Sequence, residues 1–481
     1  MAASKGDDQE LHVLMVAFAA QGHINPLLRL GNSLVSKGLH VTLATTEVVY
    51  HRVFRSSTST AVTNSITVNG IQVLFFSDGF DSDEDRKKTN IDQYMENMER
   101  VGPTNLSNLI KNHYVGGSNK KLACIINNPF VPWVADVAEE AGIPCACVWI
   151  QPCALYAIYY RFYNELDQFP TETEPEKVVE LPGFPLLRPQ DLPSFILPTN
   201  TFGSMPKVLS EMFRNMKKLK WLLANSFYEL EKDAIDSMAD LCPILPVGPL
   251  VPPSLLSEHE HNQKQDVGIE MWKPEDSCIE WLNNKPPRSV IYISFGSLIV
   301  PSAKQIESIT NALKKTKRHF LWVMKPSENS TIAGEAGELP MGFLEETKEQ
   351  GLVVTWCPQT KVLVHPATAC FLTHCGWNSV LEAITAGIRM IAYPRWTDQP
   401  TNAKLVSDVF RLGIRLEQDG DGLIGSQEVE RAIEEIVGGP RSEEIKKRAE
   451  KLKLAAREAV ADGGSSDLNI QLFVDQLTGR R

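Results

Sequence analysis

The sequence predicts an α/β protein built from two doubly wound halves that face each other across a cleft, and three observations lead to this prediction. Short apolar runs alternate with helical stretches along the 481 residues, as expected of parallel strands buried on both faces. A proline-rich segment, 243–274, interrupts the alternation. An equally regular alternation then resumes. Two parallel sheets with right-handed crossovers explain all three observations.

The first half contains six of these apolar runs. They lie at residues 12–19, 39–46, 71–77, 122–127, 145–150 and 221–226. A helical period of leucines follows the first run and ends at Gly38, a residue type that commonly closes helices. Because helical stretches separate the runs, we expect one parallel sheet with helices on both faces.

The second half repeats the pattern after a linker. Its expected strands lie at residues 289–296, 320–324, 352–356, 370–374 and 389–394. We therefore expect an N-terminal domain at residues 1–246, an interdomain linker at 247–274 and a C-terminal domain at 275–460. Residues 461–481 are expected to form a helix that packs back on the N-terminal domain. The apolar stripe of this helix consists of Leu468, Ile470, Leu472, Phe473 and Leu477.

Composition and charge exclude several classes of protein. Apolar residues make up 43% and charged residues 22%, as in an ordinary globular protein. The net charge of −11, without a dominant basic patch, argues against nucleic acid as a partner. The nine cysteines lack metal-ligand spacing and are expected to be reduced thiols. We find no secretory signal and no apolar stretch of roughly 20 residues, so we expect a cytoplasmic protein without a membrane span.

Metal and dinucleotide sites are not expected. His259 and His261 lie in the linker without further ligands, and residues 419–422 lack the later glutamate of a calcium loop. No GxGxxG sequence follows any expected strand, which argues against a dehydrogenase. The sequence therefore predicts a site without metal or cofactor.

The strand at 370–374 leads through Gly376 directly into a helix that ends at Gly387. A helix start after such a turn presents free backbone N–H groups and the positive end of the helix dipole, which together bind anions. His374, Asn378 and Ser379 add donors at the same place. This arrangement predicts a diphosphate site.

Side chains around this helix suit the other parts of a nucleotide sugar. Glu382 lies one turn into the helix, where a carboxylate accepts from both hydroxyls of a ribose. Trp356 ends a neighbouring strand and offers a flat platform for a base, and Gln359 follows one turn later. Asp398 and Gln399 follow the last strand and combine acceptors with a donor for sugar hydroxyls.

The stretch from Trp356 to Gln399 resembles the plant secondary-product glycosyltransferase signature of the family 1 UDP-sugar transferases, which likewise begins with Trp and ends with Gln. The similarity in organisation covers essentially the whole chain. It implies a GT-B fold of two Rossmann-like domains, with the acceptor in the N-terminal domain and the UDP-sugar in the C-terminal domain.

The resemblance also implies a role for each matching residue. Trp356 stacks on uracil, and Gln359 and Glu382 hold the ribose. Ser297, His374, Asn378 and Ser379 hold the diphosphate, and Trp377, Asp398 and Gln399 face the sugar. A terminal Gln usually goes with glucose, so the expected donor is UDP-glucose. Arg389 stands where Pro is usual and is expected only to begin a strand, and Arg395 is expected to be solvated.

His23 is the candidate general base of the first half. It follows the first strand, at a helix start. On its own such a histidine is often a helix cap, but imidazole also titrates near neutral pH, as a base requires. The resemblance implies that His23 deprotonates the acceptor, which attacks the anomeric carbon from the face opposite UDP and inverts it.

Asn128 marks a departure from the family pattern. Relatives commonly carry an Asp there that orients the histidine. An amide can hold a tautomer but cannot stabilise an imidazolium as a carboxylate does, so the pair should be a weaker base. A phenol has a pKa of about 10, whereas a carboxylic acid has one of about 4 and arrives already ionised. A weak base therefore favours a carboxyl acceptor.

The surroundings of Asn128 also resemble the plant subgroup that forms glucose esters of aromatic acids. The similar segments are 124–130, 148–154, 179–187, 191–195 and 224–231. An apolar acceptor pocket is expected from aromatic residues on cleft loops or helices. Its candidates are Phe18, Tyr94, Phe130, Trp149 and Phe195.

The sequence thus predicts an inverting, metal-independent UDP-glucose transferase, a hexosyltransferase of plant secondary metabolism that acts as a monomer. The acceptor is a small aromatic or lipophilic molecule, such as a phenolic acid or a flavonoid-like compound, with a carboxyl favoured over a phenol. Two alternatives remain: carbon-glycosylation of a phenolic ring, and a weakly active protein that binds the UDP-sugar.

Overall fold

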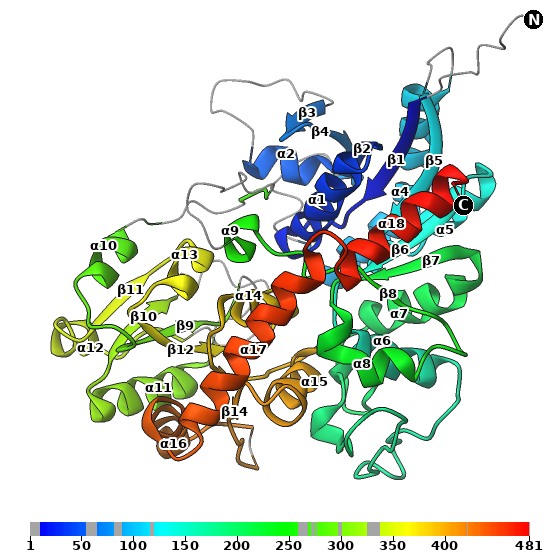
Figure 1. Cartoon of the computed structure of the whole chain (residues 1–481). Coiled ribbons are helices and arrows are strands. Elements are labelled where there is room, and N and C mark those ends of the chain that lie inside the picture. The colour runs from blue at the N-terminus through cyan, green and yellow to red at the C-terminus, as the bar shows by residue number, and fades with distance from the viewer. Residues whose placement is uncertain are drawn as a thin grey trace, which may run out of the picture.

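Two parallel β-sheets, each covered by helices, lie side by side in the computed structural model of the chain (Figure 1). The structure describes residues 10–53, 65–80, 89–115, 120–257, 268–270, 275, 277–296, 301–324, 337–420 and 422–480. The GT-B arrangement of two doubly wound domains is confirmed by this architecture.

The N-terminal sheet has eight strands in the order β3-β4-β2-β1-β5-β6-β7-β8. Their bounds are β1 Glu10–Val16, β2 His40–Thr46, β3 Ser65–Val68, β4 Ile71–Phe76, β5 Lys120–Asn127, β6 Cys145–Trp149, β7 Leu219–Ala224 and β8 Leu245–Pro246. All neighbours pair in parallel except β3, which runs antiparallel to β4.

The C-terminal sheet has six parallel strands in the order β11-β10-β9-β12-β13-β14. Their bounds are β9 Val290–Ser294, β10 His319–Val323, β11 Gly351–Val354, β12 Thr368–Thr373, β13 Met390–Ala392 and β14 Gly413–Arg415. Every apolar run predicted to be a strand overlaps one. The strands β3, β8 and β14 were not predicted, because they are two to four residues long and offer too few positions for a pattern.

Helices cover both faces of each sheet. In the N-terminal half they are α1 Gln21–Ser36, α2 Glu47–Val53, α4 Ile91–Tyr114, α5 Val134–Glu140, α6 Cys153–Tyr163, α7 Ser204–Arg214 and α8 Tyr228–Asp236. The short α9, Pro253–Leu256, belongs to the proline-rich segment and packs against the C-terminal half. In the C-terminal half they are α10 Ser277–Asn283, α11 Ala303–Thr316, α12 Phe343–Glu346, α13 Gln359–Val364, α14 Trp377–Ala386, α15 Gln399–Lys404, α16 Ser426–Gly438, α17 Ser442–Val460 and α18 Ser465–Thr478. Separate apolar cores on the two faces of each sheet hold these layers together.

The last helix, α18, lies against the N-terminal sheet and α1, after α17 has crossed from the C-terminal half (Figure 1). Phe473 packs edge-on against Trp221 of β7, and the Trp221 indole donates to Gln476. Leu468 and Leu472 of the predicted stripe are exposed. The C-terminal helix, which follows the C-terminal half in sequence, thus completes the core of the N-terminal half.

The described part of the proline-rich segment is packed rather than free in solvent. Leu255 of α9 joins the C-terminal core, and Ile269 joins the N-terminal core. The Asn25 side chain accepts from Ile269 N at 2.8 Å and donates to Ile269 O at 3.3 Å. These contacts attach the segment to both halves.

Arg389 is an interior anchor rather than only a strand start. It is buried next to β13 and donates to the carbonyls of Ile436 at 2.7 Å and Ala369 at 3.2 Å, and to Ser442 Oγ at 2.6 Å. It therefore ties the end of α16 and the start of α17 to the sheet. Arg395, by contrast, is exposed, as predicted.

We expect Arg389→Ala to lower the free energy of unfolding by about 2–4 kcal/mol, because it leaves buried acceptors without their charged donor. Urea unfolding followed by circular dichroism measures this loss. Arg395→Ala is the matched control and should stay within about 0.5 kcal/mol of the parent. Equal stability of the two variants would contradict the anchoring role.

Candidate active site

The strand order of each sheet reverses beside its first strand, and the predicted site residues follow the strands at these two points. β1 lies between β2 and β5, and β9 lies between β10 and β12. Loops at such switch points open a crevice at the carboxyl ends of the strands, where ligands bind in α/β proteins. His23 and Asn128 follow β1 and β5, and His374 follows β12. The fold thereby brings together residues that are far apart in sequence.

His23 and Asn128 form a hydrogen-bonded pair. His23 lies in the first turn of α1, and its Nδ1 is 2.8 Å from Asn128 Oδ1. The backbone N–H of Phe130 also donates to Asn128 Oδ1, at 3.3 Å, so this atom is the amide oxygen rather than the nitrogen. His23 Nδ1 must therefore carry the proton, and the lone pair of Nε2 is the basic site.

The electrostatic surroundings make His23 a weak base. Burial lowers the pKa of His23 to about 4, and the hydrogen bond to Asn128 only partly opposes this effect. Asn128 is itself fully buried and carries no charge that would stabilise an imidazolium. The imidazole is consequently neutral at pH 7. Its Nε2 can accept a hydrogen bond, but protonation to the imidazolium is unfavourable.

Aromatic rings surround this pair. Phe18 and Phe130 lie 5.1 and 4.8 Å from the His23 ring, centroid to centroid, and Tyr94 packs edge-on against Phe18 at 5.9 Å. Phe80, which the sequence reading missed, stacks on Tyr94 at 6.0 Å. Phe80 lies just beyond the carboxyl end of β4, and this position after a predicted strand could have identified it from the sequence. The four rings supply the apolar, aromatic setting expected for the acceptor.

The other two acceptor candidates lie elsewhere. Trp149 has no exposed surface, packs edge-on against Tyr156 and donates to Pro152 O, so it belongs to the core rather than to a pocket wall. Phe195 is mostly buried and contacts Phe202, which stacks on Trp396 of the C-terminal half at 4.8 Å. Hydrophobic periodicity in the sequence cannot distinguish aromatic side chains of the core from those that line a pocket.

The predicted diphosphate site is an uncapped helix start. Gly376 is the N-cap of α14 and provides no side-chain cap, so the first N–H groups remain available for an anion. His374 lies against Gly296 and Gly376: a Cβ at either position would come within 2.6 or 2.5 Å of its Nε2. Burial lowers the pKa of His374 to about 4, so this imidazole is a neutral donor at pH 7. Ser297 lies outside the described residues.

The predicted ribose-binding side chains form one network. Gln359 Nε2 donates to Glu382 at 2.8 Å and to Ser379 Oγ at 3.1 Å, while Tyr292 donates to Gln359 Oε1 at 2.9 Å. Trp356, half-buried, packs beside them against the C-terminal core. The Glu382 carboxylate is therefore held in place before any ligand arrives.

The residues predicted to face the sugar are all buried and hydrogen-bonded within the protein. Asp398 is buried, accepts from Thr397 at 2.6 Å and Asn402 at 2.7 Å, and burial raises its pKa. Gln399 Oε1 accepts from Arg395 N at 3.0 Å. The Trp377 indole is buried and donates to Asn225 O at 2.7 Å, so this residue offers its backbone N–H rather than its ring.

The two halves meet at these loops. Asn378 Nδ2, on the first turn of α14, donates to Gly22 O at 2.9 Å. Gly22 immediately precedes His23, so the predicted base lies directly beside the predicted diphosphate site. A Cβ at Gly22 would lie 3.2 Å from that same amide nitrogen, which explains why a glycine suits this contact.

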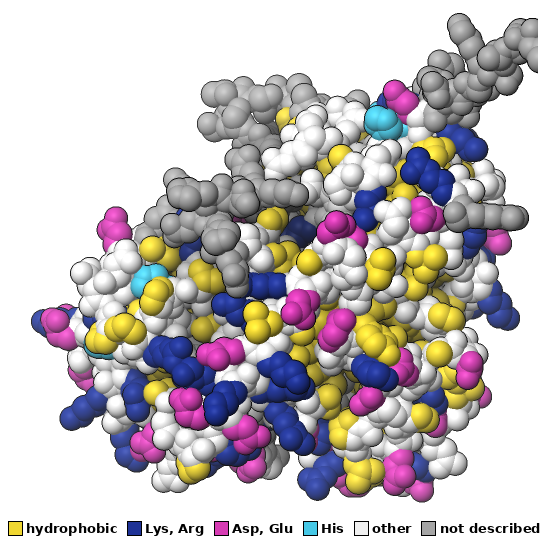
Figure 2. Space-filling view, viewed as in Figure 1, with side chains coloured by type: hydrophobic (Ala, Val, Ile, Leu, Met, Phe, Trp, Pro, Cys, Tyr) yellow, Lys and Arg dark blue, Asp and Glu magenta, His cyan; other side chains and the backbone are white. Residues whose placement is uncertain are grey.

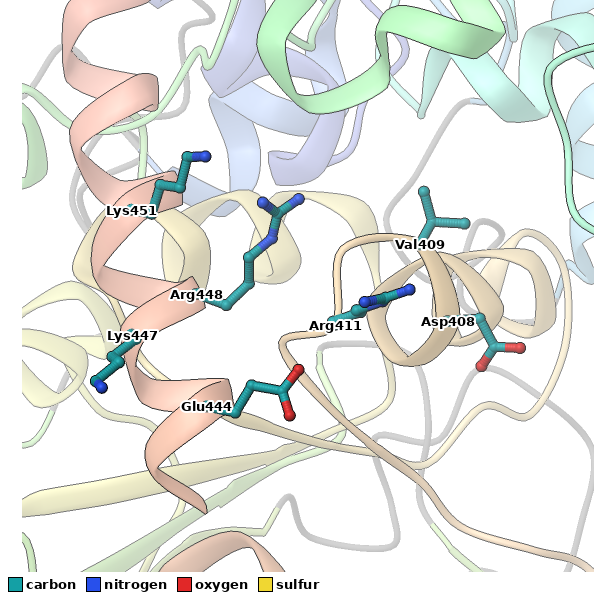
Figure 3. A pocket seen from close by; sticks show the side chains of 7 residues that line it. All are labelled: Asp408, Val409, Arg411, Glu444, Lys447, Arg448 and Lys451. Atoms are coloured by element: carbon teal, nitrogen blue, oxygen red, sulfur yellow. The ribbon is translucent and has the colours of Figure 1, made fainter. Parts of the chain in front are cut away.

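A surface hollow of about 440 Å³ lies away from these residues, between α17 and the segment after α15, and its lining is mainly basic (Figure 3). Its lining consists of Asp408, Val409, Arg411, Glu444, Lys447, Arg448 and Lys451. Charged side chains of both signs are interspersed on the surface around α17 (Figure 2). His259 and His261 lie outside the described residues. None of the described helices is long and apolar enough to cross a membrane.

Comparisons with known proteins agree with this geometry. The sequence model described as "UDP-glucoronosyl and UDP-glucosyl transferase" matches residues 260–452. A limonoid UDP-glucosyltransferase of Citrus unshiu is 42% identical over 98% of this chain and 91% of its own length. A gallate 1-beta-glucosyltransferase of Punica granatum is 42% identical over 99% of this chain and 90% of its own length.

Among solved structures, Os79 from O. sativa in complex with UDP superimposes with a TM-score of 0.84. It is 30% identical, and the match covers 97% of this chain and 100% of that chain. Sequence and structure therefore agree over nearly the full length. The chain belongs to the family of UDP-glucuronosyl and UDP-glucosyl transferases and is a UDP-dependent glycosyltransferase.

Proposed function

We propose that this enzyme transfers glucose from UDP-glucose, with inversion, to the carboxylate of a small aromatic acid and so forms a glucose ester. The observation that supports the proposal most directly is the pair of a neutral, weakly basic His23 and an uncharged Asn128, set among aromatic rings. A relative named for transfer to gallate, an aromatic carboxylate, also supports it.

The donor is proposed to lie across the first turn of α14. Uracil stacks on Trp356, and the ribose hydroxyls bind Glu382 and Gln359. The diphosphate lies at the N-terminus of α14 with His374, Asn378, Ser379 and Ser297. The glucose faces Asp398 and Gln399, whose carboxylate and amide groups match sugar hydroxyls.

Proton energetics favour an acid over a phenol. Moving a proton from a phenol with a pKa of about 10 to an imidazole with a pKa of about 4 costs roughly 8 kcal/mol, at about 1.36 kcal/mol per unit. A carboxylic acid is ionised at pH 7 and needs no base at all. His23 then has no proton to accept, and because its Nε2 carries a lone pair it cannot donate to the carboxylate either.

Asn128 also has a free donor. Its Nδ2 is buried and has no hydrogen-bond partner among the described residues. A buried N–H without a partner costs about 1–3 kcal/mol, and an incoming carboxylate oxygen is the kind of acceptor that removes this cost. An aspartate at this position would instead repel the same carboxylate.

The reaction follows from this placement. A carboxylate oxygen attacks the anomeric carbon from the side of His23, and the bond between that carbon and the UDP oxygen breaks on the opposite side. The electron pair leaves with UDP, and its negative charge is stabilised by the N–H groups of α14 and by His374. The product is an inverted glucose ester, and no net proton transfer is required.

The test pairs each aromatic acid with the phenol that lacks the carboxyl and measures UDP release from UDP-glucose. We expect release with the acids and products that mild alkali cleaves, as it cleaves esters. Alkali-stable products formed from the phenols would contradict the proposal and indicate O- or C-glycosylation. UDP-glucose binding without UDP release would indicate a binding protein.

The pH dependence should differ between the two acceptor classes. The base form of His23 is lost only as the pH falls through about 4, and an aromatic acid with a pKa of about 4 ionises over the same range. We therefore expect kcat/KM for an acid to be level from about pH 5 to 8. For a phenol it should keep rising with pH. A midpoint near pH 6.5 with the acid would contradict a depressed His23 pKa.

The enzyme is proposed to act in the cytoplasm, as a monomer and without a catalytic metal. Treatment with EDTA should leave UDP release unchanged, because the diphosphate is bound by N–H groups and neutral side chains. A loss of activity that Mg²⁺ or Mn²⁺ restores would contradict a metal-independent reaction.

A further inference from the structure

We propose that Glu10, His12 and His40 form a binding site for a zinc-class divalent ion. The site lies at the amino ends of the central strands β1 and β2, at the opposite end of the N-terminal sheet from the catalytic loops. His12 on β1 and His40 on β2 are register partners in parallel strands. Glu10 lies two residues before His12, and side chains two apart on a strand share one face. The register therefore places two imidazoles and one carboxylate together on one face of the sheet.

The distances within this group are short. One ligand atom from each residue lies within 4.8 Å of the other two. His12 Nε2 is 3.4 Å from Glu10 Oε2, and the two imidazole rings are stacked with centroids 4.8 Å apart. Among the described residues, no other group of three or more His, Cys, Asp or Glu side chains has its ligand atoms this close together.

The burial pattern suits a site that closes around an ion. His12 is 6% exposed, whereas Glu10 and His40 are exposed. Zn–N distances of about 2.0–2.1 Å require ligand atoms about 3.3 Å apart. His12 Nε2 and Glu10 Oε2 already lie 3.4 Å apart, so closure around an ion requires the exposed His40 imidazole, whose plane is 19° from that of His12, to turn a ring nitrogen toward them.

The polar contacts of His12 leave its ring available to an ion. Its Nε2 contacts Glu10 Oε2, a member of the same group. His12 Nδ1 is buried and has no hydrogen-bond partner among the described residues, so the ring has an unused nitrogen as well.

The donor set selects the class of ion. Two imidazoles and one carboxylate match the preference of Zn²⁺ and similar borderline ions, whereas Mg²⁺ and Ca²⁺ prefer oxygen ligands alone. Three protein ligands leave one position for water. The site lies at the amino ends of β1 and β2, while His23 follows the carboxyl end of β1. The ion would therefore link two strands and take no part in glycosyl transfer.

The experiment uses the untagged, full-length enzyme after EDTA treatment and gel filtration. Zinc chloride is titrated in competition with a chromophoric chelator, and thermal unfolding is followed with and without one equivalent of zinc. We expect one zinc per chain and a higher unfolding midpoint. His40→Gln and Glu10→Gln should each weaken zinc binding by about tenfold or more, since each removes one of three ligands.

The matched control is His113→Gln. His113 lies beside Lys120 near the same sheet edge but outside the three-residue group, so its replacement should leave zinc affinity unchanged. Equal zinc affinity in the parent and His40→Gln, or a greater loss in His113→Gln, would overturn the proposal. Loss of UDP release at one equivalent of zinc that persists in His40→Gln would place the ion in the catalytic cleft and would overturn it too.

Discussion

Replacing Asn128 with aspartate should reverse the acceptor preference. Two unit charges about 5 Å apart, at an effective dielectric constant of about 20, repel by about 3 kcal/mol. Asn128→Asp should therefore lower kcat/KM for an aromatic acid about 100-fold or more, because the bound carboxylate meets a like charge. With the matching phenol, kcat/KM should rise, since a carboxylate stabilises the imidazolium that forms on His23. The measurement is the ratio of the two values for a matched acid and phenol.

A second variant separates charge from hydrogen bonding. Asn128→Ala removes the amide without adding a charge, so it should lower kcat/KM for the acid by less than Asn128→Asp does, and it should not raise kcat/KM for the phenol. The pH profile provides an independent readout. The new carboxylate in Asn128→Asp should raise the pKa of His23 and make it a stronger base, so phenol turnover should become level above that pKa instead of rising with pH throughout. If Asn128→Asp and Asn128→Ala reduce acid turnover equally, repulsion is not the cause, and the proposed role of Asn128 is wrong.

Replacing Glu382 with alanine should have the largest effect on the donor. Hydrogen bonds to a charged group contribute about 1.5–3 kcal/mol each, and the carboxylate is proposed to accept from two ribose hydroxyls. We expect kcat/KM for UDP-glucose to fall by about 10²–10³-fold, corresponding to about 3–4 kcal/mol. Part of this loss comes from Gln359, whose Nε2 loses its partner at 2.8 Å.

Two controls distinguish a binding defect from misfolding. Glu382→Gln keeps one acceptor oxygen and the shape of the side chain, so it should retain part of the affinity for UDP. The acceptor KM should not change in either variant, because His23 and the aromatic rings are untouched. Isothermal titration with UDP measures the affinity directly. Unchanged UDP affinity in Glu382→Ala would show that this carboxylate does not hold the ribose.

Much of the proposed donor site was predictable because its residues are close in sequence. Gly376, Asn378, Ser379 and Glu382 follow a single strand, so the periods of strand and helix alone place them at one helix start. The same argument placed His23 after β1. These local patterns do not depend on how distant segments pack.

Other features depended on contacts between distant segments. The burial of Trp149, the inclusion of Phe80 among the aromatic rings and the interior role of Arg389 follow from neighbours that no local period reveals. The packed state of the proline-rich segment belongs to the same class, because composition indicates a linker but not what it touches.

Local sequence patterns were enough to predict two doubly wound domains, a helix start after Gly376 where we propose the nucleotide-sugar site, and a histidine at the first switch point. The packing of distant segments was needed to show that Phe130 N–H fixes the orientation of the Asn128 amide, that Asn378 joins α14 to Gly22, and that strand register gathers Glu10, His12 and His40. Hydrophobic periodicity encodes which face of an element is buried. Hydrogen-bond partners and pKa shifts depend instead on the atoms that the completed fold brings within a few ångströms.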